Sequence, residues 1–297
     1  MSRKYKIKGH ETFGIREGWM SKGMIAVQEN PKVFRENFGT DALGVGTNMA
    51  KAIRYWLQAA GLITKKKEGM FLTEFGKLVY EYDRYVEDIT TLWLLHIHVA
   101  RNAELATSWN LFFRGGEIKG QKEFDRDSLF VWMKRELQLY TQEEELSDRS
   151  VQDDCNVLLH MYCQQTLEKI DPEDKKISPF CRLHLLKKEG KNYKRIAPKI
   201  ETLHPYVVWY VLCEMFAQSN NVNIQKIVQG YNSPGSLLQL GQIEINYYLD
   251  LLEEKGIIAI NRTAGLDMVY EKKACSSIDI IRNYYMGGRE GEALNNH

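Results

Sequence analysis

The sequence lacks the apolar runs and cysteine patterns that mark membrane, secreted and zinc-ribbon proteins. Its longest apolar run, residues 91–100, falls well short of the about 20 residues that a helix needs to cross a bilayer. No N-terminal stretch resembles a signal peptide. The five cysteines are odd in number and include no Cys-x-x-Cys pair, which favours reduced thiols. We therefore expect a cytoplasmic protein that has no contact with a membrane.

The sequence also lacks the signatures of common enzyme classes. It has no Gly-x-Ser-x-Gly, no kinase signature and no zincin motif. Gly44-Val45-Gly46 is not followed by the Lys and Ser/Thr of a phosphate-binding loop, nor by the continuation of a dinucleotide loop, so it is predicted to be a turn. We accordingly predict no catalytic residue, no metal and no cofactor, and expect a binding protein instead of an enzyme.

Three groups of potential ligands are predicted to be structural. His10 and Glu11 have no second ligand at helical or hairpin spacing. His96 and His98 lie two apart in an apolar helix, so they point to different faces and favour core packing. Two cysteines eight residues apart lie two helical turns from each other, too far to share an ion. This last group comprises Asp153, Asp154, Cys155, His160 and Cys163.

Charge is balanced overall but segregated along the chain. The formal net charge is +1, from 40 Lys and Arg against 39 Asp and Glu. Residues 1–67 nevertheless hold thirteen basic residues against five acids, an excess of eight, and residues 182–199 form a second basic stretch. Residues 143–154 are acidic. A basic end is typical of a nucleic-acid partner.

The N-terminal basic region shows the pattern of a winged helix. Residues 48–60 place apolar side chains at helical spacing, Thr47 is a candidate N-cap, and Gly61 stands at the stop position. Short strands are expected at residues 62–64 and 70–73, joined by a lysine-rich turn, and a further helix follows. In this fold the long helix enters the major groove and the hairpin lies along the phosphates. We assign residues 1–84 to this unit.

The same order recurs near the other end. Helices are expected at residues 206–217, 224–229 and 242–254, followed by a hairpin with Gly265 in its turn. The longest of these helices is acidic, so we assign residues 201–297 to a second winged unit that contacts protein, either a modification enzyme or a second copy of the chain. DNA binding by this unit is the alternative. Residues 85–200 are expected to be a helical middle region that ends in a small hairpin at residues 180–197. The predicted fold class is mainly α.

A set of residues in the first unit is predicted to contact DNA. Cations in the arm and in the turn would neutralise phosphates, while polar residues on the long helix would reach base edges. The alternatives are a solvated helix face and a tail whose aromatic residues anchor it to the first unit. The set comprises Arg3, Lys4, Lys6, Lys8, Arg16, Thr47, Asn48, Lys51, Arg54, Tyr55, Lys65, Lys66 and Lys67.

Several stretches resemble the prokaryotic family catalogued as domain of unknown function 4007. They are GHETFGIREGW at residues 9–19, LGVGTNMAKAIRYWLQAAGLI at 43–63 and TLWLLH at 91–96, with weaker echoes elsewhere along nearly the whole chain. The segment KISPFC at 176–181 departs from the family pattern, which has an acidic stretch before a Ser-Pro-Leu core. The resemblance implies a neighbourhood of DNA phosphorothioation and anti-phage defence genes, including a sulfurtransferase similar to phosphoadenosine phosphosulfate reductase. It implies no catalytic residue.

Three functional hypotheses follow. The first is a DNA-binding accessory of a phosphorothioation or defence system, which holds double-stranded DNA through its N-terminal unit and recruits an enzyme such as that sulfurtransferase. The second is a protein-binding scaffold whose winged folds no longer bind DNA. The third is a metal-dependent nuclease whose carboxylates, Asp153 and Asp154 among them, meet only in the folded chain.

Overall fold

The computed structural model describes residues 3–115, 122–163, 177–263 and 267–287, and it is mainly helical with three small antiparallel sheets. Gly265 and the last two residues of the helix expected at 151–165 lie outside these ranges. No described helix has the length and apolarity to span a bilayer. The expected fold class is confirmed at the level of a mainly helical protein.

The N-terminal region contains the expected long helix and hairpin. Its elements are α1 (Trp19–Glu29), η1 (Asn37–Gly39), α2 (Thr40–Leu43), α3 (Thr47–Ala59), β1 (Ile63–Lys65), β2 (Met70–Leu72) and α4 (Glu74–Tyr82). α3 buries Ile53, Trp56 and Leu57 and begins and ends within one residue of its prediction. Gly61 follows it at φ +69°, a left-handed conformation that favours glycine. The antiparallel pairing of β1 with β2 then closes the hairpin.

The middle region consists of four longer helices and a small sheet. Its elements are α5 (Ile89–Arg101), α6 (Thr107–Phe113), β3 (Glu123–Phe124), α8 (Arg126–Thr141), α9 (Asp148–Tyr162), η3 (Pro179–Leu183), β4 (Leu186–Glu189), β5 (Asn192–Arg195) and η4 (Ile200–Thr202). The hairpin expected at 180–197 is present as β4 and β5, with Gly190 at its tip at φ +62°. β3 adds a third strand beside β5, giving the order β3-β5-β4. A two-residue strand carries too little alternation to be found in the sequence.

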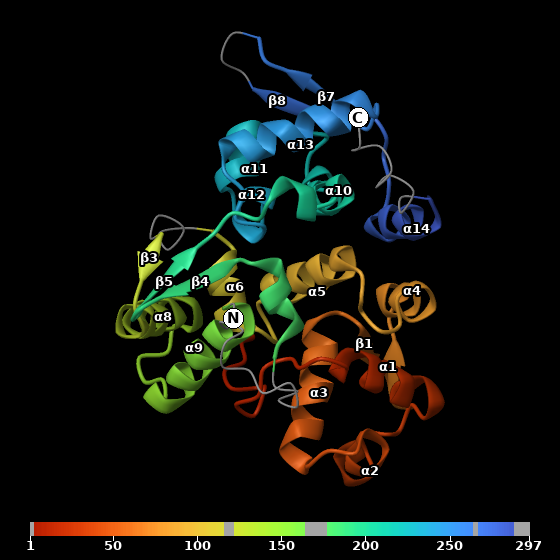
Figure 1. The fold of residues 1–297 in the computed structure, drawn as a ribbon, viewed down its shortest axis with the longest axis vertical. Coiled ribbons are helices and arrows are strands. Elements are labelled where there is room, and N and C mark those ends of the chain that lie inside the picture. The colour runs from red at the N-terminus through yellow and green to blue at the C-terminus, as the bar shows by residue number, and fades with distance from the viewer. Residues whose placement is uncertain (1–2, 116–121, 164–176, 264–266, 288–297) are drawn as a thin grey trace.

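The C-terminal region repeats the order of helices followed by a hairpin. Its elements are α10 (Pro205–Phe216), β6 (Asn221–Asn223), α11 (Ile224–Gln229), α12 (Pro234–Leu237), α13 (Gln242–Glu254), β7 (Ile258–Asn261), β8 (Met268–Glu271) and α14 (Ser277–Gly287). β6 joins the hairpin to make a sheet in the order β6-β8-β7. α14 returns to pack on α4 as well as α10, so the last described helix joins the C-terminal region to the N-terminal region (Figure 1).

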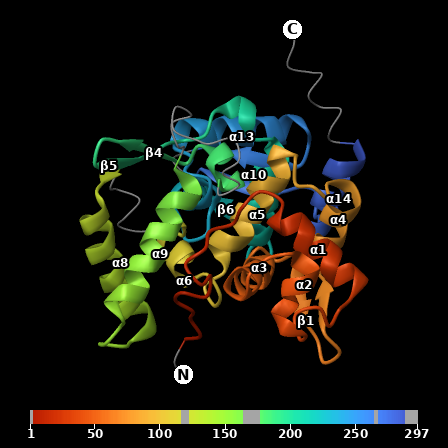
Figure 2. The same cartoon turned by 60° about the horizontal axis from the view of Figure 1, so that its bottom comes forward.

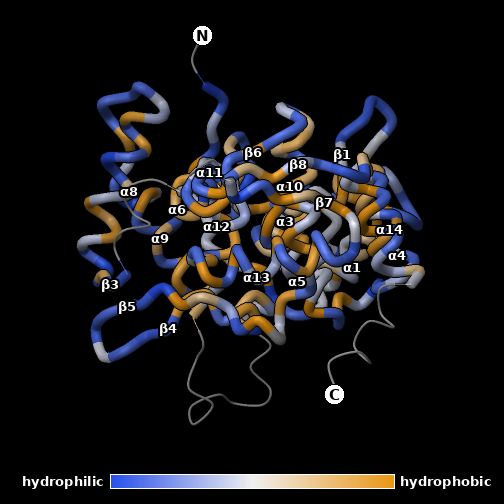
Figure 3. The backbone as a smooth tube through the Cα atoms, turned by 90° about the horizontal axis from the view of Figure 1, so that it is seen from above, coloured by the Kyte–Doolittle hydropathy of each residue, from blue (hydrophilic) through white to orange (hydrophobic). Residues whose placement is uncertain are grey.

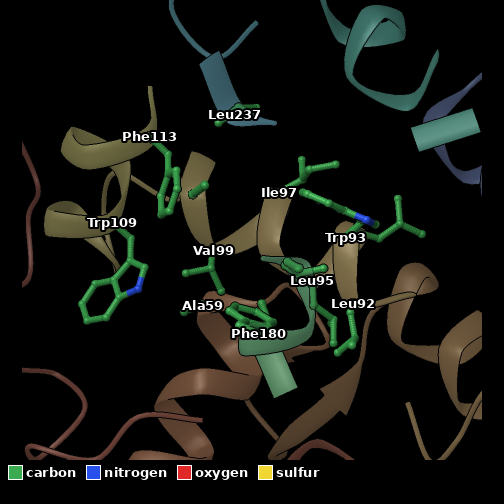
Figure 4. Packing of buried hydrophobic residues seen from close by; sticks show 14 of the residues in the cluster. Ala59, Leu92, Trp93, Leu95, Ile97, Val99, Trp109, Phe113, Phe180 and Leu237 are labelled. Carbon is green, nitrogen blue, oxygen red and sulfur yellow. The ribbon is translucent and has the colours of Figure 1, made fainter. Parts of the chain in front are cut away.

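One continuous hydrophobic core runs through all three regions. The cluster of buried side chains extends from Ile15 to Tyr285. α5 lies at its centre, and its side chains are close to Phe180 of the middle region, Leu237 of the C-terminal region and Ala59 of α3 (Figure 4). The hydropathy-coloured tube shows apolar residues gathered inside and hydrophilic ones along the β1–β2 and β4–β5 hairpins (Figure 3). The three sequence regions are therefore parts of one packed body.

Candidate nucleic-acid interface

The N-terminal arm is docked on the body of the protein along residues 3–17. Figure 2 shows it running between α6 and α3. The Lys6 backbone N–H donates to Thr107 Oγ1 at 2.9 Å, and the Lys8 backbone N–H donates to Asp154 Oδ1 at 2.8 Å. These bonds tie the backbone of the arm to α6 and α9, so the middle region places the Lys6 backbone beside α3.

A buried histidine–aspartate pair anchors the arm further. His10 and Asp154 are 0% and 1% exposed, and His10 Nε2 lies 2.8 Å from Asp154 Oδ1. Because His10 Nδ1 accepts the Thr12 N–H at 3.1 Å, Nε2 carries the hydrogen and donates it to the carboxylate. Ser108 Oγ donates to the other carboxylate oxygen at 2.5 Å. Asp154 therefore accepts hydrogen bonds from the arm and from α6 together.

A basic groove of about 480 Å³ opens between the arm, α3 and the β1–β2 hairpin. Apolar residues, among them Phe34, Met70 and Leu105, also line it. Its cations come from the arm, the loop after α1, α3 and the hairpin. They are Lys6, Arg35, Arg54, Lys65 and Lys66. Three sequence segments expected to carry DNA contacts thus meet at one surface.

The hairpin turn is held beside the loop after α1. Met70 N–H donates to Pro31 O at 2.8 Å, and Arg35 Nη2 donates to Lys67 O at 2.6 Å. Gly69 is required at this approach, because a Cβ added there would lie 2.3 Å from the Pro31 carbonyl oxygen. The turn therefore presents Lys65 and Lys66 to the groove in a defined position.

The groove cations have no anionic partners within the described part of the chain. None of the five forms an ion pair there. Lys6 and Lys66 instead lie over the rings of Tyr55 and Phe71, at 5.4 Å in each case. Cations gathered without carboxylates raise the local positive potential, which a bound anion would lower.

The other predicted contact residues lie outside the groove lining. Lys8 Nζ is 2.7 Å from Asp153 Oδ2, Arg3 lies over the Tyr140 ring, and Lys51 lies over the exposed Phe38 ring. Lys4 Nζ is 4.0 Å from Glu104 Oε2, and the Arg16 guanidinium lies over the rings of Phe13 and Trp19. Thr47 and Asn48 are exposed at the start of α3, and Lys67 is exposed in the turn.

Tyr55 was wrongly included among residues on the solvent face of the helix. It is only 5% exposed, and its hydroxyl donates to Leu105 O at 2.7 Å. The helical pattern placed it beside Arg54, but the arm and the loop before α6 cover that side of α3. Arg35 and Gln58 were missed as groove residues, although Arg35 belongs to the N-terminal basic excess.

Several of the candidate enzyme residues are buried, whereas Asp153 is partly exposed and His160 is exposed. His96 is fully buried, and its Nδ1 and Nε2 lie 2.8 Å from Tyr162 Oη and Leu237 O. Burial lowers the pKa of His96 to about 4 and raises the pKa of Cys163 to about 12. The predicted core role of His96 is confirmed. Within the described ranges, no group of three His, Cys, Asp or Glu side chains could hold a metal ion.

The C-terminal hairpin carries much weaker positive charge. Arg262, the cation expected in its turn, is 2.7 Å from Asp250 Oδ1 on α13. Ile243 and Tyr247 are exposed on the same helix, at 79% and 38%. This surface combines acidic and apolar side chains, in contrast to the basic groove.

The chain belongs to the family described as protein of unknown function (DUF4007), whose model matches residues 7–285. Its fold is similar to that in two solved structures, an SspB crystal structure and a magnesium ion-bound SspB crystal structure. Both have a TM-score of 0.82 at 20% identity and cover 99% of this chain, with 91% and 90% of the respective neighbour covered. No curated protein matches the sequence.

Proposed function

We propose that the protein binds double-stranded DNA, with the basic groove resting on the phosphate backbone. The N-terminal helices and the β1–β2 hairpin would act as a winged helix, with the exposed start of α3 directed at the major groove. The main support for this proposal is that five cations from four segments, none of them in an ion pair among the described residues, surround one groove. We further propose that the chain serves in DNA phosphorothioation or defence, in line with the genes that its family resemblance implies.

Salt dependence gives the sharpest test of this proposal. If all five groove cations contact phosphates, log K should fall with log salt at a slope of about −4.5. Affinity would then drop about 500-fold between 50 mM and 200 mM salt. Fluorescence anisotropy with a labelled duplex would measure this slope in the full chain.

A matched pair of variants separates the groove from net charge. Charge reversal to Glu at Lys6, Arg54, Lys65 and Lys66 should reduce the magnitude of the slope to below about 1 and abolish binding at 200 mM salt. The same reversal at four exposed cations elsewhere, Lys188, Lys191, Lys272 and Lys273, changes net charge equally and should leave most binding intact. Equal losses in both variants would show that the groove is not the DNA site.

The acidic and apolar face of α13 favours a second function, that of a protein-binding surface. Exposed Ile243 and Tyr247 beside Asp250 suit a protein partner better than phosphate. We propose that this face recruits a modification enzyme, such as the sulfurtransferase implied by the family resemblance. Ile243→Glu should abolish co-purification with that enzyme while the DNA-binding slope stays unchanged, and retention of the partner would refute the assignment.

The nuclease hypothesis is tested separately. The magnesium ion in one of the two SspB structures belongs to a protein that is 20% identical to this chain. Among the described residues of this chain, no group of three His, Cys, Asp or Glu side chains could hold a metal ion. We therefore assign no metal ligand. A nicking assay on supercoiled DNA with and without magnesium distinguishes an enzyme from a binding protein, and magnesium-dependent nicking that is lost in Asp153→Asn would favour the nuclease.

A further inference from the structure

A second cavity lies between the middle and C-terminal regions, and most of its lining residues are distant in the sequence from those of the basic groove. It has a volume of about 370 Å³, within the size range of small-molecule sites. Its walls come from the end of α6, from β5 and from the loop between α12 and α13. The residues that matter here are Phe112, Phe113, Lys122, Arg195, Gln239 and Glu244.

Arg195 brings a desolvated positive charge to this cavity. Its Nη2 donates to Phe112 O at 3.0 Å, and its guanidinium carbon lies 3.8 Å from the centre of the Phe112 ring. Its Nε is buried and has no hydrogen-bond partner among the described residues, and none of the described ion pairs includes Arg195. Burial lowers the pKa of Arg195 to about 9. A buried cation is costly unless an anion compensates it.

Gln239 adds unsatisfied hydrogen-bonding groups beside this charge. Both its amide nitrogen and its amide oxygen are buried without a partner among the described residues. Its backbone stands at φ +55°, which is uncommon for a residue with a side chain. Buried polar atoms in native proteins are nearly always hydrogen-bonded. The Gln239 amide and Arg195 Nε are therefore both available to hydrogen-bond a ligand in the cavity.

The carboxylate in the cavity is held by its own helix. Glu244 Oε2 accepts the Gly241 N–H at 2.9 Å at the start of α13. None of the described ion pairs joins Glu244 to Arg195. With Lys122 exposed on the cavity lining, the site holds two cations against one carboxylate.

We propose that this cavity binds the phosphate group of a small phosphate monoester. Arg195 and Lys122 supply the charge, the Gln239 amide supplies a neutral donor, and Phe113 and Leu240 offer apolar surface to the organic part of the ligand. This site is independent of the basic groove, because the two share no lining residue.

Calorimetric titration of the full chain tests the proposal. Inorganic phosphate and adenosine monophosphate are the two probes, and each should bind saturably at one site, the nucleotide more tightly. Arg195→Met should weaken phosphate binding at least about tenfold, since a hydrogen bond to a charged group is lost. Gln239→Leu should weaken it severalfold. Lys188→Met, which removes an exposed cation on the neighbouring strand β4, should leave it unchanged.

Further control experiments distinguish this site from other sites on the protein that could bind phosphate. The Lys65→Glu, Lys66→Glu double variant should retain phosphate binding, and its loss there would place the ion in the groove and overturn the proposal. A blunt unphosphorylated duplex should not displace the nucleotide, and displacement would identify the ligand as DNA phosphate. Absence of saturable binding, or wild-type affinity in folded Gln239→Leu and Lys122→Met, would also overturn it. These two variants decide the matter if Arg195→Met does not fold.

Discussion

Replacing Asp154 with alanine would remove the acceptor that holds the N-terminal arm to the body. Three groups donate to this carboxylate: the Lys8 backbone N–H, His10 Nε2 and Ser108 Oγ. The carboxylate is 1% exposed, so water does not replace it in the native protein without entering the core. Each donor left unsatisfied in a buried site costs about 1–3 kcal/mol.

The three losses are not additive, because a water molecule admitted to the vacated space would satisfy some of the donors. Three unsatisfied donors would together cost about 3–9 kcal/mol, and we therefore expect a loss near the lower end of that sum, about 4 kcal/mol in the free energy of unfolding. That is a large part of the about 5–15 kcal/mol typical of a folded protein. Urea denaturation followed by tryptophan fluorescence would measure it, since Trp56 and Trp109 both pack around His10.

Two companion variants bracket this result. Asp154→Asn keeps an acceptor oxygen of the same size and should lose only about 1–2 kcal/mol, through the missing charge. Asp153→Ala removes a partly exposed ion pair with Lys8 and should lose less than about 1 kcal/mol. An Asp154→Ala protein within about 1 kcal/mol of wild type would refute the assignment of this residue as the anchor of the arm.

The anchor also predicts an effect on DNA binding. If the arm loosens in Asp154→Ala, Lys6 leaves the groove, and the magnitude of the salt slope should fall by about 0.9. The salt slope is measured at a temperature well below the midpoint of thermal denaturation, so that both the Asp154→Ala variant and the wild-type protein are folded. An unchanged slope would separate the anchor from the groove.

The remaining predictions concern pH and the hairpin. Because the pKa of buried His96 is about 4 in the folded protein, against 6.5 when unfolded, unfolding takes up a proton below pH 6.5. Stability should therefore fall as pH drops from 6.5 to 4, by about 1.4 kcal/mol per unit from this group. His96→Gln should reduce the slope of stability against pH by that amount in acid denaturation, while His98 and His204, whose pKa values burial also lowers, keep the rest of the slope. Thr73→Ala should cost about 1–2 kcal/mol, because the Thr73 side chain caps α4 at the Gly76 N–H, 2.9 Å away; urea titration would measure this, and no loss would exclude the cap. Gly69→Ala should displace the turn from Pro31 and weaken duplex affinity at low salt, whereas wild-type affinity would show that the turn position is unimportant.

The local helices and hairpins of this protein can be predicted from its amino-acid sequence. The apolar spacing at residues 48–60, with a glycine stop, was sufficient for α3, and the lysine-rich turn between two short apolar segments was sufficient for β1 and β2. These features depend on neighbours within a few residues, so they can be seen without the fold. The core position of His96 followed in the same way, from a helix that is apolar on all sides.

The contacts between residues far apart in the chain depend on how its segments pack in three dimensions. His10 and Asp154 are 144 residues apart, and nothing in either local pattern indicates that one buried carboxylate serves the arm and α6 together. Tyr55 had a polar position on its helix, yet a segment from elsewhere in the chain covers it. The groove cations and the unsatisfied pair of Arg195 and Gln239 likewise come from separate segments. Charge and burial at such places depend on packing between segments, which local periodicity does not encode.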